Sequence, residues 1–197
     1  MKTNPILTKN WTPYGVALLG AAVVVILAWM SRGKVNPVMA GEEAPRFSAL
    51  DREGGSFSSD AHRGKVLLVN IWATWCTTCK EEMPSMERLY EQLGGEEFEI
   101  LAVSIDAPMG QLDLFGMSGR DPWAYADSLS LTFPILHDPS GDAAETFRIT
   151  GVPESFVIDR EGVIIRKVTG PTTWDAPDYV ALFERLLRSS AGAGPDT

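Results

Sequence analysis

Two apolar runs on either side of a helical pattern limit most strongly how this chain can fold. Residues 66–72 (VLLVNIW) and 98–105 (FEILAVSI) are short and almost continuously apolar, as strands buried on both faces of a sheet are. Between them, apolar side chains recur at helical spacing after Cys76, and Gly94-Gly95 ends this pattern. Strand, helix and strand in this order predict a parallel crossover unit and therefore an α/β fold.

Shorter patterns predict further elements around this unit. Residues 51–55 (DREGG) and 160–162 (REG) are turn signals, and each joins two strand-like runs in a hairpin. An amphipathic pattern over 177–188 predicts a final helix. The other predicted elements are strands at 47–50, 56–57, 156–159 and 163–168, a short apolar run at 133–136, and helices near 123–129 and at 141–147.

A long uncharged segment near the N-terminus is typical of a membrane anchor. No charge occurs between Lys9 and Arg32, and a helix over these 22 residues is about 33 Å long, against about 30 Å for a hydrocarbon core. Trp11 and Tyr14 lie near one end and Trp29 near the other, where interfacial aromatic residues belong.

We therefore predict a transmembrane anchor at 14–31, preceded by an N-terminus at 1–13 and followed by a linker at 32–43. Two alternatives to this anchor stay open. One is a signal peptide cleaved after Val38-Met39-Ala40, although Arg32 and Lys34 lie between the apolar run and that position, and the other is a buried core helix.

The charge of the chain is unevenly distributed and excludes one class of partner. Residues 1–40 carry four basic side chains and no acid, whereas residues 41–197 carry 13 basic and 26 acidic side chains, a net charge of −13. So acidic a domain repels phosphate, and we expect no nucleic-acid partner.

The two cysteines of the chain, Cys76 and Cys79, lie at the predicted start of the helix after the first buried strand. Residues three apart in the first turn share a face, so their sulfur atoms can bond at about 2.05 Å. Free N–H groups and the helix dipole favour a thiolate at Cys76, whose pKa we expect below the free value of about 8.5. Cys76 is the predicted nucleophile, and Cys79 the residue that resolves the mixed disulfide.

The alternatives for this pair are a stabilising bridge and half of a metal site. A bridge that closes so short a loop stabilises weakly. A metal site would need His62 and His137, and neither has ligand spacing. The sequence therefore predicts redox chemistry, with no metal and no cofactor.

Two segments carry a resemblance to a known family. Residues 70–84 (NIWATWCTTCKEEMP) resemble the active-site segment of membrane-anchored thioredoxin-like proteins of the TlpA/ResA/CcmG (DsbE) type, and residues 151–159 (GVPESFVID) resemble their second signature. The resemblance implies a thioredoxin fold over 44–189: a central mixed sheet flanked by helices, with an N-terminal β-hairpin extension. Residues 190–197 are expected to be a disordered tail.

The resemblance also implies a location. It places the domain on the extracytoplasmic, periplasmic side of a bacterial cytoplasmic membrane, held by the single-pass anchor, with residues 1–13 in the cytoplasm.

The resemblance implies roles for three apolar residues at the substrate-binding side of the site. In the family, the proline of the second signature follows a cis peptide bond and its backbone lies against the disulfide, which implies the same for Val152–Pro153. The backbone beside it is expected to pair with an incoming substrate strand. Trp75, directly before the nucleophile, fits a contact platform for substrate, with ordinary core packing as the alternative.

Two acidic residues are also implied in the site. Glu82 follows Cys79 by three residues, as an acid does in the family, and a carboxylate there can accept or return the Cys79 proton. A solvated helix charge is the alternative. Glu154 follows the proline, as in the cytochrome c maturation members. Two acids near the thiols would raise the thiol pKa values and favour a reducing potential.

Two departures from relatives matter. Cytoplasmic thioredoxins carry a buried acid where this chain has Asn70, which makes Glu82 the better proton acceptor. Residues 107–122 are longer than the usual connection. Their Met and Phe side chains either bind a partner or pack, and we expect packing.

The implied activity is that of a thiol-disulfide oxidoreductase that reduces client disulfides in cytochrome c maturation or related redox homeostasis. The expected clients are apocytochrome c or assembly factors of copper oxidases, and a membrane thiol reductase is expected to supply electrons. One alternative is a peroxiredoxin-like antioxidant enzyme, but that chemistry wants Thr or Ser where this chain has Ala73. The other is a metal or haem chaperone that uses the two thiols.

Overall fold

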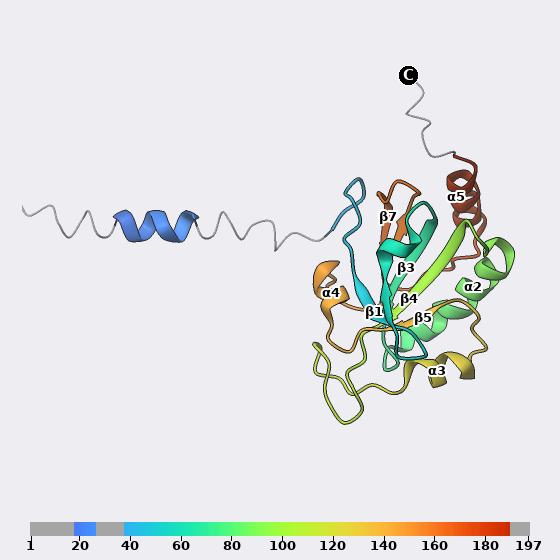
Figure 1. Cartoon of the computed structure of the whole chain (residues 1–197), viewed down its shortest axis with the longest axis horizontal. Coiled ribbons are helices and arrows are strands. Elements are labelled where there is room, and N and C mark those ends of the chain that lie inside the picture. The colour runs from blue at the N-terminus through green and yellow to red at the C-terminus, as the bar shows by residue number, and fades with distance from the viewer. Residues whose placement is uncertain (1–17, 27–37, 190–197) are drawn as a thin grey trace, which may run out of the picture. The chain divides into compact units, whose positions relative to one another are not determined.

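The computed structural model describes residues 18–26 and 38–189. The chain divides into two units, Met1–Asn36 and Pro37–Thr197, and each is treated by itself. In the first unit, residues 18–26 are helical. The second unit contains a single sheet with helices on both faces, as Figure 1 shows.

The predicted N-terminus at 1–13 and tail at 190–197 lie outside the described residues, as do most of the predicted anchor at 14–31 and residues 32–37 of the linker. Within the two described ranges, we find no helix that has both the length and the apolar character required to span a bilayer.

Seven strands form the sheet in the order β2-β1-β5-β4-β3-β6-β7. The neighbours β3, β4 and β5 run parallel, and the other pairs are antiparallel, so the sheet is mixed as expected. The strands are β1 (Ser48–Leu50), β2 (Ser56–Ser58), β3 (Val66–Trp72), β4 (Phe98–Ser104), β5 (Ile135–His137), β6 (Glu154–Ile158) and β7 (Ile164–Thr169).

Helices cover both faces of the sheet. One face packs against α2 and α5, and the other against α4, which Figure 1 shows on the opposite side. Alternation along β3 supplies both cores: Leu68 and Trp72 face α2, whereas Val69 and Ile71 face α4. The helical segments are the 3₁₀ helix η2 (Ser59–His62) and the α-helices α2 (Thr77–Leu93), α3 (Pro122–Ser128), α4 (Asp142–Thr146) and α5 (Pro177–Arg188).

The predicted crossover unit is confirmed. β3 covers the predicted residues 66–72, all seven of them buried, and β4 pairs with it in parallel along its full length. The helix between them ends where Gly94 donates its N–H to the Tyr90 carbonyl at 2.7 Å. Both predicted hairpins and the final helix at 177–188 are also present.

Several element boundaries differ by one or two residues from the sequence prediction, and two differences have a clear physical reason. β6 begins at Glu154 rather than at 156, because the backbones of Glu154 and Ser155 pair with Ile71 and Asn70 of β3 although their side chains are polar. The packed domain also begins before residue 44. Val38 is buried, and the backbone at 41–42 pairs with Ile164 at the start of β7.

Candidate active site

Cys76 and Cys79 are joined by a disulfide at the first turn of α2, with their Cα atoms 5.3 Å apart. Cys76 is the N-cap residue, and its Sγ accepts the Cys79 N–H at 3.1 Å. The first turn of α2 contains no acidic residue, so no other negative charge competes for the helix dipole there. Cys76 keeps 5% of its surface exposed and Cys79 only 1%, the order expected for an attacking and a resolving thiol.

A buried polar network holds the turn between β3 and α2. The fully buried carboxylate of Asp106 accepts the Thr74 N–H, the Thr74 hydroxyl and the Ser104 hydroxyl at 2.7–2.8 Å. The Thr74 hydroxyl in turn accepts the N–H of Arg120 at 2.8 Å. Because Thr74 precedes Cys76 by two residues, this network fixes where α2 begins relative to the sheet.

Glu82 is a buried carboxylate on the cysteine face of α2, with 2% of its surface exposed. Its Oε1 accepts a hydrogen bond from Asn70 Nδ2 at 2.8 Å, and its Oε2 accepts from the Thr172 N–H at 3.1 Å and from Trp174 Nε1 at 3.4 Å. Asn70 also donates to the Ser155 hydroxyl at 2.8 Å. Glu82 is therefore a held group inside the domain and not a solvated helix charge.

Burial raises the pKa of Glu82 from 4.5 to about 7, against the opposing hydrogen bonds from Asn70, Thr172 and Trp174. A carboxyl group with this pKa exchanges a proton readily near neutral pH. Its place on α2, one turn beyond Cys79, suits a proton exchange with that thiol.

Three partners of Glu82 were not foreseen as parts of the site. Thr172 and Trp174 belong to the segment before α5, about 90 residues further along the chain. The Ser85 hydroxyl donates to the Glu82 carbonyl at 2.7 Å and accepts the Trp174 N–H at 2.9 Å. The one available signal was a tryptophan in an otherwise polar segment (PTTWD), and that tryptophan is fully buried.

The peptide bond between Val152 and Pro153 is cis, as the resemblance implied. Pro153 is buried directly before β6, and its carbonyl accepts the Gly170 N–H at 2.9 Å. Val152 is partly exposed and packs against the hydrophobic cores on both faces of the sheet, as does Trp75. The two side chains thus lie where the cores meet, at the end of the sheet that carries the cysteines.

Trp75 connects the cysteines to the long connection at 107–122, which we call the 107–122 loop. Its Nε1 donates to Asp113 Oδ2 at 2.7 Å, and its ring meets that of Phe115 edge-on at 6.1 Å between centroids. The expectation that the Met and Phe side chains of this loop pack is wrong for Met109, which is 85% exposed. Met117 and Phe115 are only partly packed, with 43% and 37% of their surface exposed.

Glu154 does not lie with Glu82. It is opposite Ile71 in the pairing of β6 with β3, so its side chain is on the α4 face of the sheet, whereas Glu82 is on the α2 face. Its carboxylate forms a buried ion pair with Lys167 at 2.7 Å and accepts from Thr150. The two acids that were expected to act together on the thiols therefore lie on opposite faces of the sheet.

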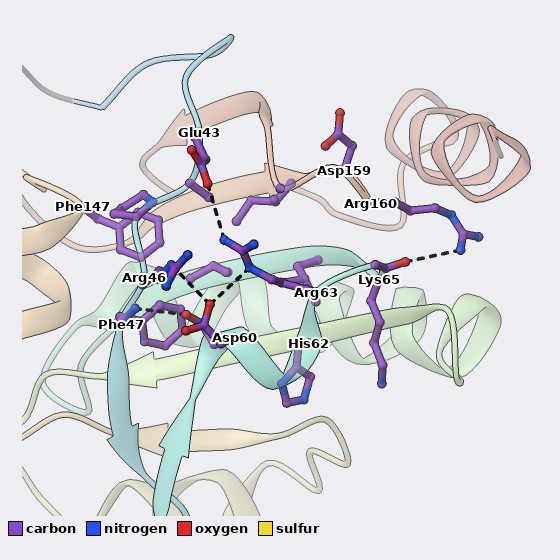
Figure 2. Close-up of a pocket in the computed structure, with 18 residues that line it drawn as sticks. Glu43, Arg46, Phe47, Asp60, His62, Arg63, Lys65, Phe147, Asp159 and Arg160 are labelled. Carbon is purple, nitrogen blue, oxygen red and sulfur yellow. Dashed lines mark hydrogen bonds and ion pairs between the residues drawn. The ribbon is translucent and has the colours of Figure 1, made fainter. Parts of the chain in front are cut away.

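Figure 2 shows a pocket that is separate from this site. Its apolar floor comes from the α4 face of the sheet, and four of its charged side chains pair with one another. Asp60 lies 3.4 Å from Arg46 and 3.2 Å from Arg63, which also reaches Glu43. Over residues 18–26 and 38–189, no three His, Cys, Asp or Glu side chains gather in a way that could hold a metal ion.

A mixed sheet between helices, a disulfide-bonded cysteine pair at a helix start and a cis-proline directly before β6 define a thioredoxin-like protein. The AhpC/TSA family matches residues 40–167, more than half of the chain, and the chain belongs to this family. It is 30% identical over 156 residues to the thiol-disulfide oxidoreductase ResA of Bacillus cereus, a match covering 79% of this chain and 84% of that protein.

Two further relatives agree with this assignment. The thioredoxin-like protein YneN of Bacillus subtilis is 34% identical over 127 residues, which cover 64% of this chain and 69% of that one. A Chlorobium tepidum crystal structure, of a protein assigned as the thiol:disulfide interchange protein DsbE, has a TM-score of 0.64 and 23% identity over 77% of this chain and 99% of that one. This second likeness shows the shared fold. The predicted enzyme class, a thiol-disulfide oxidoreductase, is confirmed.

Because burial raises the pKa of Glu82, its ionisation should make stability depend on pH. Below about pH 4.5 the group is neutral in both states, whereas between 4.5 and 7 only the unfolded chain loses the proton, so stability falls as pH rises. We predict that the unfolding free energy of the oxidised protein, relative to Glu82→Gln, falls by about 2–3 kcal/mol between pH 5 and 8. Urea titrations at each pH measure this difference.

The matched control is Glu81→Gln, which removes an exposed carboxyl group one residue earlier on α2. The difference in unfolding free energy between this control and the unchanged protein should stay nearly constant over the same pH range. A constant difference for Glu82→Gln as well would contradict the raised pKa.

Proposed function

We propose that this chain is a membrane-tethered protein-disulfide reductase whose domain works outside the cytoplasm. The observation that carries the proposal is the cysteine pair at the start of α2, with Glu82 buried one turn beyond Cys79. This arrangement combines an attacking sulfur atom, a resolving sulfur atom and a group able to move one proton.

The first step is attack by the Cys76 thiolate on a sulfur atom of a client disulfide. One S–S bond forms between Cys76 and the client, the client disulfide breaks, and the second client sulfur leaves as a thiolate that takes a proton from water. The N–H of Cys79 points at Cys76 Sγ in the oxidised structure and is positioned to stabilise the thiolate before attack.

The second step releases the client. Cys79 gives its proton to the Glu82 carboxylate and attacks Cys76 Sγ, the mixed disulfide breaks, and the client leaves with both sulfur atoms reduced. Two electrons have then passed from the cysteine pair to the client, and the Cys76–Cys79 disulfide remains. A membrane thiol reductase would have to return the two electrons.

Three features support the membrane anchor, the disulfide substrate and the class of client in this proposal. The uncharged segment at 10–31 is long enough for a single-pass anchor. Ala73 stands where a peroxiredoxin needs a hydroxyl group, which favours disulfide over peroxide as the substrate. The resemblance of residues 70–84 and 151–159 to the TlpA/ResA/CcmG (DsbE) family favours clients such as apocytochrome c or copper-oxidase assembly factors, whose cysteines must be reduced for assembly.

Trapping variants test the roles of the two cysteines. Cys79→Ala should accumulate a mixed disulfide with a client, because attack proceeds and release cannot. Cys76→Ala should accumulate none. Non-reducing electrophoresis of the reduced variants with a disulfide-containing client measures both, and equal trapping by the two variants would contradict the assignment.

Removing the proton acceptor should slow release but not attack. For Glu82→Gln we predict release at least about 100-fold slower, since positioned acid–base groups contribute about 10²–10⁴-fold. Rapid acid quenching should show a transient mixed disulfide, and release by the unchanged protein should quicken as pH rises through about 7. Glu81→Gln is the control, and equal effects of the two variants would contradict the role of Glu82.

Thiol labelling in intact cells tests the location. After treatment with a reductant that does not cross membranes, a membrane-impermeant maleimide should label Cys76 of the full chain, and the chain should stay with the membrane after alkaline washing. A Cys76→Ala/Cys79→Ala variant controls for other labelling. Labelling only after permeabilisation, or release of the chain into the soluble fraction, would overturn the proposed location.

A further inference from the structure

The 107–122 loop concentrates the exposed apolar surface of the domain. Over residues 38–189, eight large apolar side chains are exposed, and five of them lie inside this loop, in the nine-residue stretch 109–117. Figure 1 shows the loop, in yellow-green, extending from the body of the domain. So dense an apolar surface on a soluble domain is typical of an interaction site. The five are Met109, Leu112, Leu114, Phe115 and Met117.

The negative charge of the loop is taken up by hydrogen bonds within the protein. Asp113 is the only charged residue between 107 and 119, and both of its carboxylate oxygens are occupied. Oδ1 accepts the N–H groups of Phe115 and Met117 at 2.9 and 3.0 Å, and Oδ2 accepts Trp75 Nε1 at 2.7 Å. The loop therefore presents an apolar surface on a domain whose sequence has a net charge of −13 over residues 41–197.

The loop is also fixed to the active site. Trp75, which binds Asp113, directly precedes Cys76, and the base of the loop is held where the Arg120 N–H reaches Thr74. At Gly119 the backbone lies so close to Asp106 that an added Cβ would be 1.8 Å from its Oδ1. A partner seated on the Phe115 end of the loop therefore lies against Trp75, the residue directly before Cys76.

We propose that the 107–122 loop is the docking surface for the client polypeptide, and that it selects an extended, unfolded segment with apolar side chains next to the disulfide. This proposal rests on the proposed function and names its substrate class. Apolar side chains beside cysteines are accessible mainly before a client folds, because folding buries them. The contact with Trp75 makes the loop continuous with the place where the client disulfide must meet Cys76.

Two other occupants fit the observations less well. A bilayer or a second copy seated on the loop would lie beside Cys76 and obstruct the client. The net charge of −13 also opposes approach to an anionic membrane surface or to another copy. An uncharged apolar peptide meets neither obstacle.

The test uses the reduced full chain and three probes. Two synthetic peptides contain the same disulfide ring, flanked in one by Leu, Val and Phe and in the other by Ser, Gln and Asn. Hydroxyethyl disulfide is the third probe and has no flanking residues. Each rate constant is divided by the rate of the same probe with dithiothreitol, so that only recognition by the protein remains.

For Met109→Ser/Leu112→Ser, we expect the apolar-peptide rate, relative to hydroxyethyl disulfide, to fall about tenfold, since two side chains would lose apolar contact with the client. The relative rate of the polar peptide should change less than twofold. Ile165→Ser is the matched control, an exposed apolar residue on β7, and should leave both ratios unchanged.

An unchanged apolar ratio, or an equal fall for both peptides, would overturn the proposal. So would a variant that changed only vesicle binding or self-association, since the loop would then serve a membrane or a second copy. If the unchanged protein reduced hydroxyethyl disulfide without preferring the apolar peptide, the docking proposal alone would fail. If it reduced none of the probes, the proposed function would fail as well.

Discussion

The hydrogen bond from the Cys79 N–H to Cys76 Sγ is the interaction on which the rest of the site depends. It places the first sulfur atom at the start of α2, where free N–H groups and the helix dipole favour negative charge. That position requires β3 to stop at Trp72 and the chain to turn within a few residues. Asp106 holds this turn by binding Thr74, so a carboxylate after the neighbouring strand positions the cysteines.

The two faces of the sheet each carry a buried carboxylate, and the two carboxylates differ in their partners. On the α2 face, Glu82 is buried without a cation, which raises its pKa and keeps it able to exchange a proton. On the α4 face, Glu154 is buried with Lys167 and is held as an ion pair. Both carboxylates are buried, but within the described part of the chain only Glu154 has a cationic partner.

Features that are local in the sequence were predictable, and features that join distant segments were not. The two buried strands, the helix between them, the cysteine pair and the final helix each follow from a pattern within its own segment of the chain. The contact of Trp174 with Glu82 spans 92 residues, and no local pattern reports it. The face of the sheet on which the Glu154 side chain lies is set by strand pleating and by the register of β6 with β3, and no local pattern reports that register. The exposure of Met109 depends on Asp113 folding the loop around Trp75, a contact between segments 38 residues apart.

The two sulfur atoms of the reduced site are unequal: Cys76 is ionised and the more exposed of the two at the helix start, and Cys79 is buried behind it. The most direct measurement is the alkylation rate of each cysteine in the fully reduced protein at pH 7, resolved by peptide mass spectrometry. We predict that iodoacetamide modifies Cys76 at least about ten times faster than Cys79, because thiolate fraction and exposure both favour Cys76. Equal rates, or faster modification of Cys79, would show that the two sulfur atoms do not have these unequal roles.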